Sequence, residues 1–203
     1  MGKVPIILVV VDDDVRIKDE DAFIDEANDT FERVEFFSNS NDAIKFIEEN
    51  VNQKMIVILD LGFTHNMLDG HQTLEKIRTL SLLIPVIIWS GRDEDKETFA
   101  DLIDNRAYAF IKKSASTQEM MDVVMKAYED MQSNIDNVIE GWLQNHVQKD
   151  IDKPFMVSSS GESYTLEEVL KEIRLQTDFG KEITKNINKL TIDLLMRNKE
   201  KLQ

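Results

Sequence analysis

Short apolar runs alternate with longer segments of mixed polarity along the first 130 residues of the chain. Two of the runs, Met55–Leu59 and Val86–Trp89, are apolar throughout, which is typical of strands buried on both faces of a parallel sheet. Strand and helix patterns in strict alternation predict an α/β fold, a doubly wound five-stranded parallel sheet with right-handed crossovers. The five predicted strands are Ile6–Val11, Val34–Phe37, Met55–Leu59, Val86–Trp89 and Ala109–Ile111.

The segments between these runs carry apolar residues at helical spacing. Ser40 or Asn41 is expected to cap the second helix, and Asp69 with Gly70 to open the third. Ser116-x-x-Glu119 has the form of a capping box for the fifth helix. The apolar positions are Phe23, Ile24, Ala27 and Phe31, then Ala43, Ile44, Phe46 and Ile47, then Leu74, Ile77 and Leu80, then Phe99, Leu102 and Ile103, then Met120, Val124 and Ala127.

The fifth helix is predicted to extend well beyond such a sheet. Its apolar stripe continues at spacings of three and four through Met131, Ile135, Val138 and Trp142, and no proline follows before Pro154. A stripe this long indicates one sustained amphipathic helix. Because the sheet covers only the first half, the second half must pack on another element.

Two further helices are predicted after a loop from Lys153 to Ser163. Thr165-x-x-Glu168 resembles another capping box, and the last helix begins near Thr177 or Asp178. Its apolar seam is Ile183, Ile187, Leu190 and Leu194. Two helices of about 40 residues bury too little core alone, so they are expected to dock on the extended helix or on a partner. The predicted domains are therefore 1–130 and 131–203, the second a small α-helical appendage.

The net charge of −15 lies entirely in the first part of the chain. Residues 1–150 hold 15 Lys and Arg against 30 Asp and Glu, whereas residues 151–203 hold nine of each. This acidity repels nucleic acid. A stripe of Lys181, Lys185 and Lys189 leaves DNA binding as the less favoured alternative, since such stripes are usually solvated.

Composition narrows the class further. The chain has no cysteine, which excludes disulfides and thiolate chemistry. It contains no apolar run of about 20 residues to span a membrane, and its start lacks the features of a secretory signal. A cytoplasmic protein is the simplest expectation.

Functional groups stand where four of the predicted strands end: Asp12 and Asp13, Asp60, Ser90, and Lys113. In open parallel sheets, ligands bind outside the carboxyl ends of the strands. Three carboxylates, a hydroxyl and an ammonium gathered there suit a hard cation and a phosphoryl group. Any one of these residues alone is ordinary, since aspartates often cap helices. Their joint order is informative.

Residues 4 to about 130 resemble a receiver domain of the two-component response regulators, a flavodoxin-like fold. The matching segments are V-V-V-D-D-D, I-L-D, M-L-D-G with G-H-Q-T-L-E-K-I-R, P-V-I-I-W-S-G and A-F-I-K-K-S, in that order. The resemblance implies a phosphoacceptor in a phosphorelay rather than a turnover enzyme. It also implies a sensor histidine kinase or phosphotransfer protein as a partner.

The resemblance assigns roles to the residues at the strand ends. Asp60 would accept the phosphoryl group, and Asp12, Asp13, Asp60 and the Gly62 carbonyl would hold Mg²⁺. Ser90 and Lys113 would contact the phosphoryl group. Lys113 is favoured over Lys112 because the family has an aromatic residue three positions earlier, here Phe110, which with Ser90 would form the switch.

The chain departs from the family pattern in the loop after Asp60, L-G-F-T-H-N-M-L, which is longer than usual and lacks a proline. Gly91 replaces a frequent alanine. These departures bear on the lifetime of the phosphorylated state. Residues 131–203 resemble no known output domain and are expected to bind an effector protein or form a homodimer. The alternatives are a DNA-binding regulator, a degenerate receiver acting as a constitutive interaction domain, and a phosphatase using Asp12-x-Asp14, which leaves Asp60 unexplained.

Overall fold

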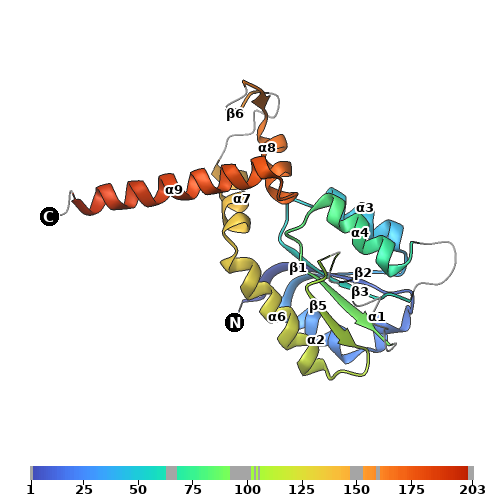
Figure 1. The fold of residues 1–203 in the computed structure, drawn as a ribbon. Helices are drawn as coiled ribbons and strands as arrows, with labels where there is room; N and C mark the ends of the chain where they lie inside the picture. The colour runs from blue at the N-terminus through green and yellow to red at the C-terminus, as the bar shows by residue number, and fades with distance from the viewer. Residues whose placement is uncertain are drawn as a thin grey trace. The chain divides into compact units, whose positions relative to one another are not determined.

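Five strands form one parallel sheet in the order β2-β1-β3-β4-β5 (Figure 1). The computed structural model describes residues 2–62, 68–91, 102, 104, 106–146, 153–158 and 161–200, except the side chains at positions 135, 142, 145, 146 and 192–200. The doubly wound parallel sheet predicted from the sequence is confirmed. Its strands are β1 Val4–Val11, β2 Phe31–Phe37, β3 Met55–Leu59, β4 Val86–Ser90 and β5 Ala109–Lys112.

Helices cover both faces of the sheet (Figure 1). The described helices of this part of the chain are α1 Arg16–Glu20, α2 Ala22–Thr30, α3 Ser40–Glu49, α4 Gly70–Leu80 and α6 Thr117–Ser133. One apolar cluster joins a face of the sheet to α2 and α6 through buried residues such as Phe23 and Val124. A second cluster joins the opposite face to α3 and α4 through residues such as Ile47 and Leu74.

The sequence expectations differ from the structure near β2. Phe31 does not belong to a helical face but begins β2, where it is fully buried. Asn39, rather than Ser40 or Asn41, caps α3 by accepting from the Asn41 amide. These differences move the start of β2 by three residues and the cap of α3 by one or two. Both concern the boundary of an element and not its existence, and boundaries are the less firmly specified.

Asp69 and Gly70 open α4 as predicted, with a full capping box to Gln72. The expected fourth helix lies largely outside the described residues. Of its apolar positions only Leu102 is described, and it is buried.

The expected single long helix is instead two helices, α6 and α7 Ile135–His146, separated by Asn134. The Asn134 side chain accepts from the Asp136 amide at 2.9 Å, as a helix cap does. The chain divides into two compact units between residues 131 and 132, so α7 belongs to the second unit.

The second unit is a small helical assembly. It contains α7, a two-stranded antiparallel ribbon of β6 Met156–Val157 and β7 Ser163–Tyr164, and then α8 Leu166–Arg174 and α9 Asp178–Glu200. The ribbon lies where a loop was expected. The capping box of Thr165 with Glu168 is present. Among the side chains of this unit that the structure describes, the buried apolar ones are Ile139, Leu143, Val169, Leu170, Ile173 and Ile183.

The seam predicted for α9 is buried only near the helix start. Ile183 is 3% exposed, whereas Leu190 is 59% exposed. Gly180 allows the start of α9 to approach α8, because a Cβ there would lie 2.2 Å from the Glu172 carbonyl oxygen. Among the described helices, none is long and apolar enough to cross a membrane.

The second unit also contains a buried ion pair. Arg174 of α8 is 3% exposed, and its Nε donates to Glu140 Oε1 of α7 at 2.6 Å. Its Nη1 donates to Glu167 Oε1 at 3.1 Å. Burial raises the pKa of Glu140 even though Arg174 opposes the shift.

Candidate functional site

The hydrogen-bond ladder of the sheet continues past the ends of three strands, which fixes the site residues at one edge. Each bond joins the amide of a residue at or just beyond a strand end to a carbonyl of the neighbouring strand. These bonds run from Asp12 to Phe37 (3.0 Å), from Asp60 to Val11 (2.9 Å) and from Lys113 to Ser90 (2.8 Å).

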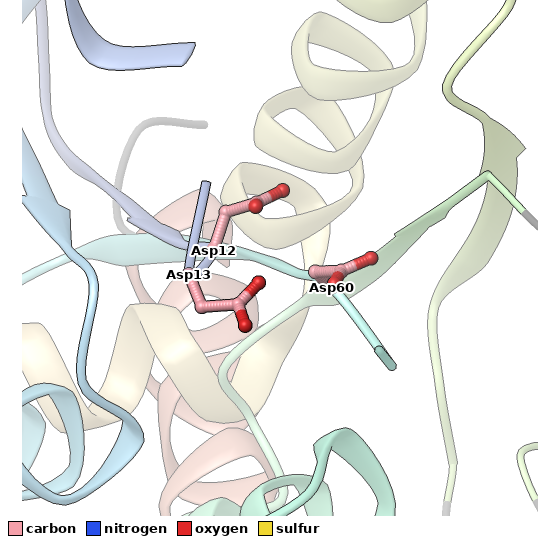
Figure 2. Close-up of side chains that lie close together, drawn as sticks. All are labelled: Asp12, Asp13 and Asp60. Atoms are coloured by element: carbon pink, nitrogen blue, oxygen red, sulfur yellow. The ribbon is translucent and has the colours of Figure 1, made fainter. Parts of the chain in front are cut away.

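Three carboxylates predicted from the sequence come together at this edge (Figure 2). Asp12, Asp13 and Asp60 each offer an oxygen, and the three oxygens lie within 4.8 Å of one another. Asp12 is fully buried, and Asp60 is 5% exposed. Carboxylates this close repel one another unless a cation compensates them.

Lys113 supplies a positive charge to the cluster. Its Nζ lies 2.6 Å from Asp12 Oδ2 and 3.3 Å from Asp60 Oδ1. Burial lowers the pKa of Lys113, but the hydrogen bonds and charges of Asp12 and Asp60 outweigh burial, so the net pKa is raised. The neighbouring Lys112 is exposed. The structure thus brings Lys113, rather than Lys112, to the cluster.

Asp12 is held from two directions. Its Oδ1 accepts from the backbone amide of Asp14 at 3.0 Å, while Oδ2 faces Lys113. Burial raises the pKa of Asp12, and the interactions with Lys113 and Asp14 only partly offset that rise. A buried carboxylate of this kind favours any bound cation that compensates its charge.

Asp14 stands apart from the cluster, although it follows Asp13 in sequence. Its carboxylate accepts three hydrogen bonds from Arg16, from Nε at 2.8 Å, from Nη2 at 2.6 Å and from the backbone amide at 3.1 Å. These bonds lower the pKa of Asp14 to about 2. The Asp14 carboxylate therefore forms a local ion pair with Arg16.

Three predicted site residues remain, Ser90, Gly62 and Phe110. Ser90 ends β4 and is 1% exposed, and the backbone amide of Gly62 donates to Asp60 Oδ2 at 3.0 Å. Phe110 of β5 is partly buried against the cluster of apolar side chains on the α3 and α4 face. Residues 63–67 of the unusual loop lie outside the described residues.

Gly70 is a structural requirement of this site. A Cβ there would lie 2.5 Å from the Asp60 carbonyl oxygen and 2.5 Å from Leu61 Cα. Both contacts are with backbone, so Gly70→Ala must displace the segment that carries Asp60. Although alanine favours helices over glycine by about 1 kcal/mol, we expect Gly70→Ala to lower the free energy of unfolding.

Gly141→Ala in α7 is the matched control, because no atom lies within 4 Å of its added Cβ. This variant should gain up to about 1 kcal/mol of stability. Chemical denaturation of both variants measures whether each substitution raises or lowers the free energy of unfolding. A Gly70→Ala protein that is more stable than the parent would contradict the close approach of Gly70 to the backbone of Asp60 and Leu61.

Sequence reasoning missed one neighbour of the site, Trp89. Its ring centroid lies 5.7 Å from Lys113 Nζ. The position just before Ser90 in an apolar strand gave no sign of this contact, since Trp89 and Ser90 alternate between faces of the sheet.

Comparison with known proteins agrees with this geometry. The family model described as "Response regulator receiver domain" matches residues 7–125, more than half of the chain. The chain therefore belongs to the family of response regulator receiver domains. No curated protein matches the chain.

Solved structures share the fold. A CheY-like receiver domain protein from Methanospirillum hungatei JF-1 is 18% identical, with a TM-score of 0.55, and the match covers 64% of this chain and 98% of that one. CheY from Borrelia burgdorferi, in a CheX-CheY-BeF3-Mg complex, is 21% identical, with a TM-score of 0.53 and coverage of 62% and 90%. NtrX from Brucella abortus is 28% identical, with a TM-score of 0.53, and the match covers 62% of this chain but only 27% of NtrX.

Proposed function

We propose that the chain is a response regulator that accepts a phosphoryl group on Asp60 in a Mg²⁺-dependent reaction. The observation that carries this proposal is the convergence of Asp12, Asp13 and Asp60 with Lys113 at the carboxyl edge of the sheet. A sensor histidine kinase or a phosphotransfer protein would supply the phosphoryl group, in the cytoplasm.

The acidic cluster fits Mg²⁺ in its donor set. Magnesium prefers oxygen ligands and pairs a few carboxylates with phosphate oxygens, and three carboxylate oxygens are available here within 4.8 Å. Asp12, Asp13, Asp60 and the Gly62 carbonyl would hold the ion. When bound, it would neutralise charge on the carboxylates and on the phosphoryl oxygens. The borrelial CheX-CheY complex contains Mg together with BeF3, which supports this choice of ion.

The protein's own groups would divide the chemistry as follows. A carboxylate oxygen of Asp60 forms the new bond to phosphorus while the bond from phosphorus to the donor breaks, and the donor keeps that electron pair. Lys113 pairs with the transferred group, and the Ser90 hydroxyl donates a hydrogen bond to it. Gly62 orients Asp60 through its amide.

Intact-mass spectrometry tests the proposal. After incubation with a small phosphodonor and Mg²⁺, the protein should gain the mass of one phosphoryl group. Chelation of Mg²⁺ before the donor is added should prevent the gain. No gain in the presence of Mg²⁺ would contradict the proposal and favour a degenerate receiver.

We further propose that the second unit is the output module and binds an effector protein or a second copy of the chain. The link is covalent and short: α6 packs on the sheet through Met120 and Val124, and only Asn134 separates it from α7. Ser90 and Phe110 would act as the switch. A phosphoryl group adds charge that a two-state element must convert into a signal.

Hydrogen exchange should reveal this coupling. We expect the exchange rates of α7, α8 and α9 amides to change when beryllofluoride and Mg²⁺ are added as a phosphoryl mimic. Asp60→Asn protein serves as the control and should show no change. Identical exchange in the second unit with and without the mimic would contradict the coupling.

A further inference from the structure

Trp89 lies in the apolar cluster on the α2 and α6 face of the sheet, next to the acidic site in sequence. The residue is 4% exposed in β4, directly before Ser90. Its ring meets Phe23 of α2 in an edge-to-face arrangement, with centroids 5.9 Å apart and an interplanar angle of 62°. Aromatic pairs prefer this arrangement. Trp89 therefore packs in the apolar core on the α2 and α6 face of the sheet.

The Lys113 ammonium lies within range of this ring. Its Nζ is 5.7 Å from the ring centroid, inside the roughly 6 Å over which a cation is attracted to an aromatic face. The same Nζ contacts Asp12 and Asp60. A Cβ at Gly91 would lie 3.7 Å from Lys113 Cδ, so the lysine stem runs past the glycine. The Lys113 ammonium thus contacts two carboxylates and lies within cation–π distance of one aromatic ring.

The indole N–H of Trp89 also lacks a hydrogen-bond acceptor among the described residues. Its nitrogen, Nε1, is buried. A buried donor without a partner is unfavourable, and phenylalanine would fill an apolar position without that cost. Packing alone therefore does not explain tryptophan here. Tryptophan does offer the strongest cation–π face of the aromatic residues.

We propose that Trp89 is a positioning residue for Lys113, holding its ammonium beside Asp60 through the π face of the indole. The proposal rests on the proposed function, because it concerns the lysine that would meet the phosphoryl group. A cation bound by the acidic cluster would weaken the attraction of Asp12 and Asp60 for Lys113. The neutral ring is unaffected by that change and keeps the ammonium at the site.

Tryptophan fluorescence tests the contact without any phosphoryl transfer. The chain has two tryptophans, so Trp142→Phe leaves Trp89 as the only tryptophan, which is excited selectively at the red edge of the absorption band. In this background, Lys113→Met should shift the Trp89 emission maximum, because a charge near the ring is removed while the stem is retained. Lys112→Met, at the exposed neighbour, should leave the spectrum unchanged. Equal spectra for Lys113→Met and the background protein would overturn the proposal.

A double-mutant cycle tests whether Trp89 affects phosphorylation through Lys113. Trp89→Leu should slow phosphorylation of Asp60 by about two- to fivefold, the range expected for one cation–π contact. Trp89→Phe, whose ring is a weaker cation–π partner than indole, should give a rate between those of the parent and Trp89→Leu proteins. In a Lys113→Met background, Trp89→Leu should have no further effect.

An equal slowing by Trp89→Leu in both backgrounds would show a packing role and overturn the proposal. If the parent protein accepts no phosphoryl group, the proposed function fails. The spectral comparison of Lys112→Met with Lys113→Met then still decides whether the ring and the ammonium interact.

Discussion

Asp60→Asn protein is expected to gain no phosphoryl mass when the parent protein gains one. Asparagine keeps the shape of the side chain, which matters at a position that is only 5% exposed. It replaces the carboxylate nucleophile with an amide that does not attack phosphorus. The backbone bond from Asp60 to Val11 does not depend on the side chain, so the fold should persist. Intact-mass spectrometry after treatment with a small phosphodonor and Mg²⁺ makes the comparison.

Asp19→Asn is the matched control for this loss. Asp19 lies in α1 and is exposed. Its substitution by asparagine removes the same charge as Asp60→Asn does. This variant should be phosphorylated as the parent is. Phosphorylation of Asp60→Asn at the parental level would place the acceptor elsewhere.

Arg174→Met is expected to destabilise the second unit by about 3–5 kcal/mol, because it leaves the Glu140 carboxylate buried without its cation. The side chains of Arg174 and Glu140 are 4% and 12% exposed, so water cannot replace the lost partner. Burial raises the pKa of Glu140 because it disfavours the charged carboxylate, and Arg174 opposes that rise. Hydrogen exchange of α7 and α8 amides measures the local loss of stability.

Two further variants separate the ion pair from general effects of the substitution. Lys171→Met changes an exposed cation on the same helix and should alter stability little. Combining Glu140→Leu with Arg174→Met should recover much of the stability lost in the single variant, since apolar replacement of a whole buried pair is often tolerated. Unchanged protection of α7 and α8 in Arg174→Met protein would show that the pair contributes nothing.

The sheet and the edge of the site were predictable because both depend on local patterns. Apolar runs such as Met55–Leu59 specify buried strands, and the carboxyl ends of parallel strands meet at one edge. Asp12 and Asp60 follow two parallel strands, β1 and β3, which are neighbours in the sheet, so their side chains meet at this edge. The choice of Lys113 over Lys112 came from the family resemblance, and the structure places Lys113 at the carboxylates.

Other features depend on contacts that no local pattern records. Asn134 interrupts the long helix without disturbing the apolar period, since a capping residue needs only one side-chain bond. Arg174 sits on an amphipathic helix, where a cation is expected to be solvated. Its partner Glu140 is 34 residues away. Such pairings are set by tertiary packing, and the same holds for Trp89 and Lys113.

The most direct test of the central claim is to locate the phosphoryl group. After treatment with a small phosphodonor, the acyl phosphate is trapped by borohydride reduction, and the modified position is identified by peptide mass spectrometry. We predict a single modified residue, Asp60, in the presence of Mg²⁺ and none after chelation. Modification at another residue, or no modification with Mg²⁺ present, would contradict the assignment of this acidic cluster as a phosphoacceptor site.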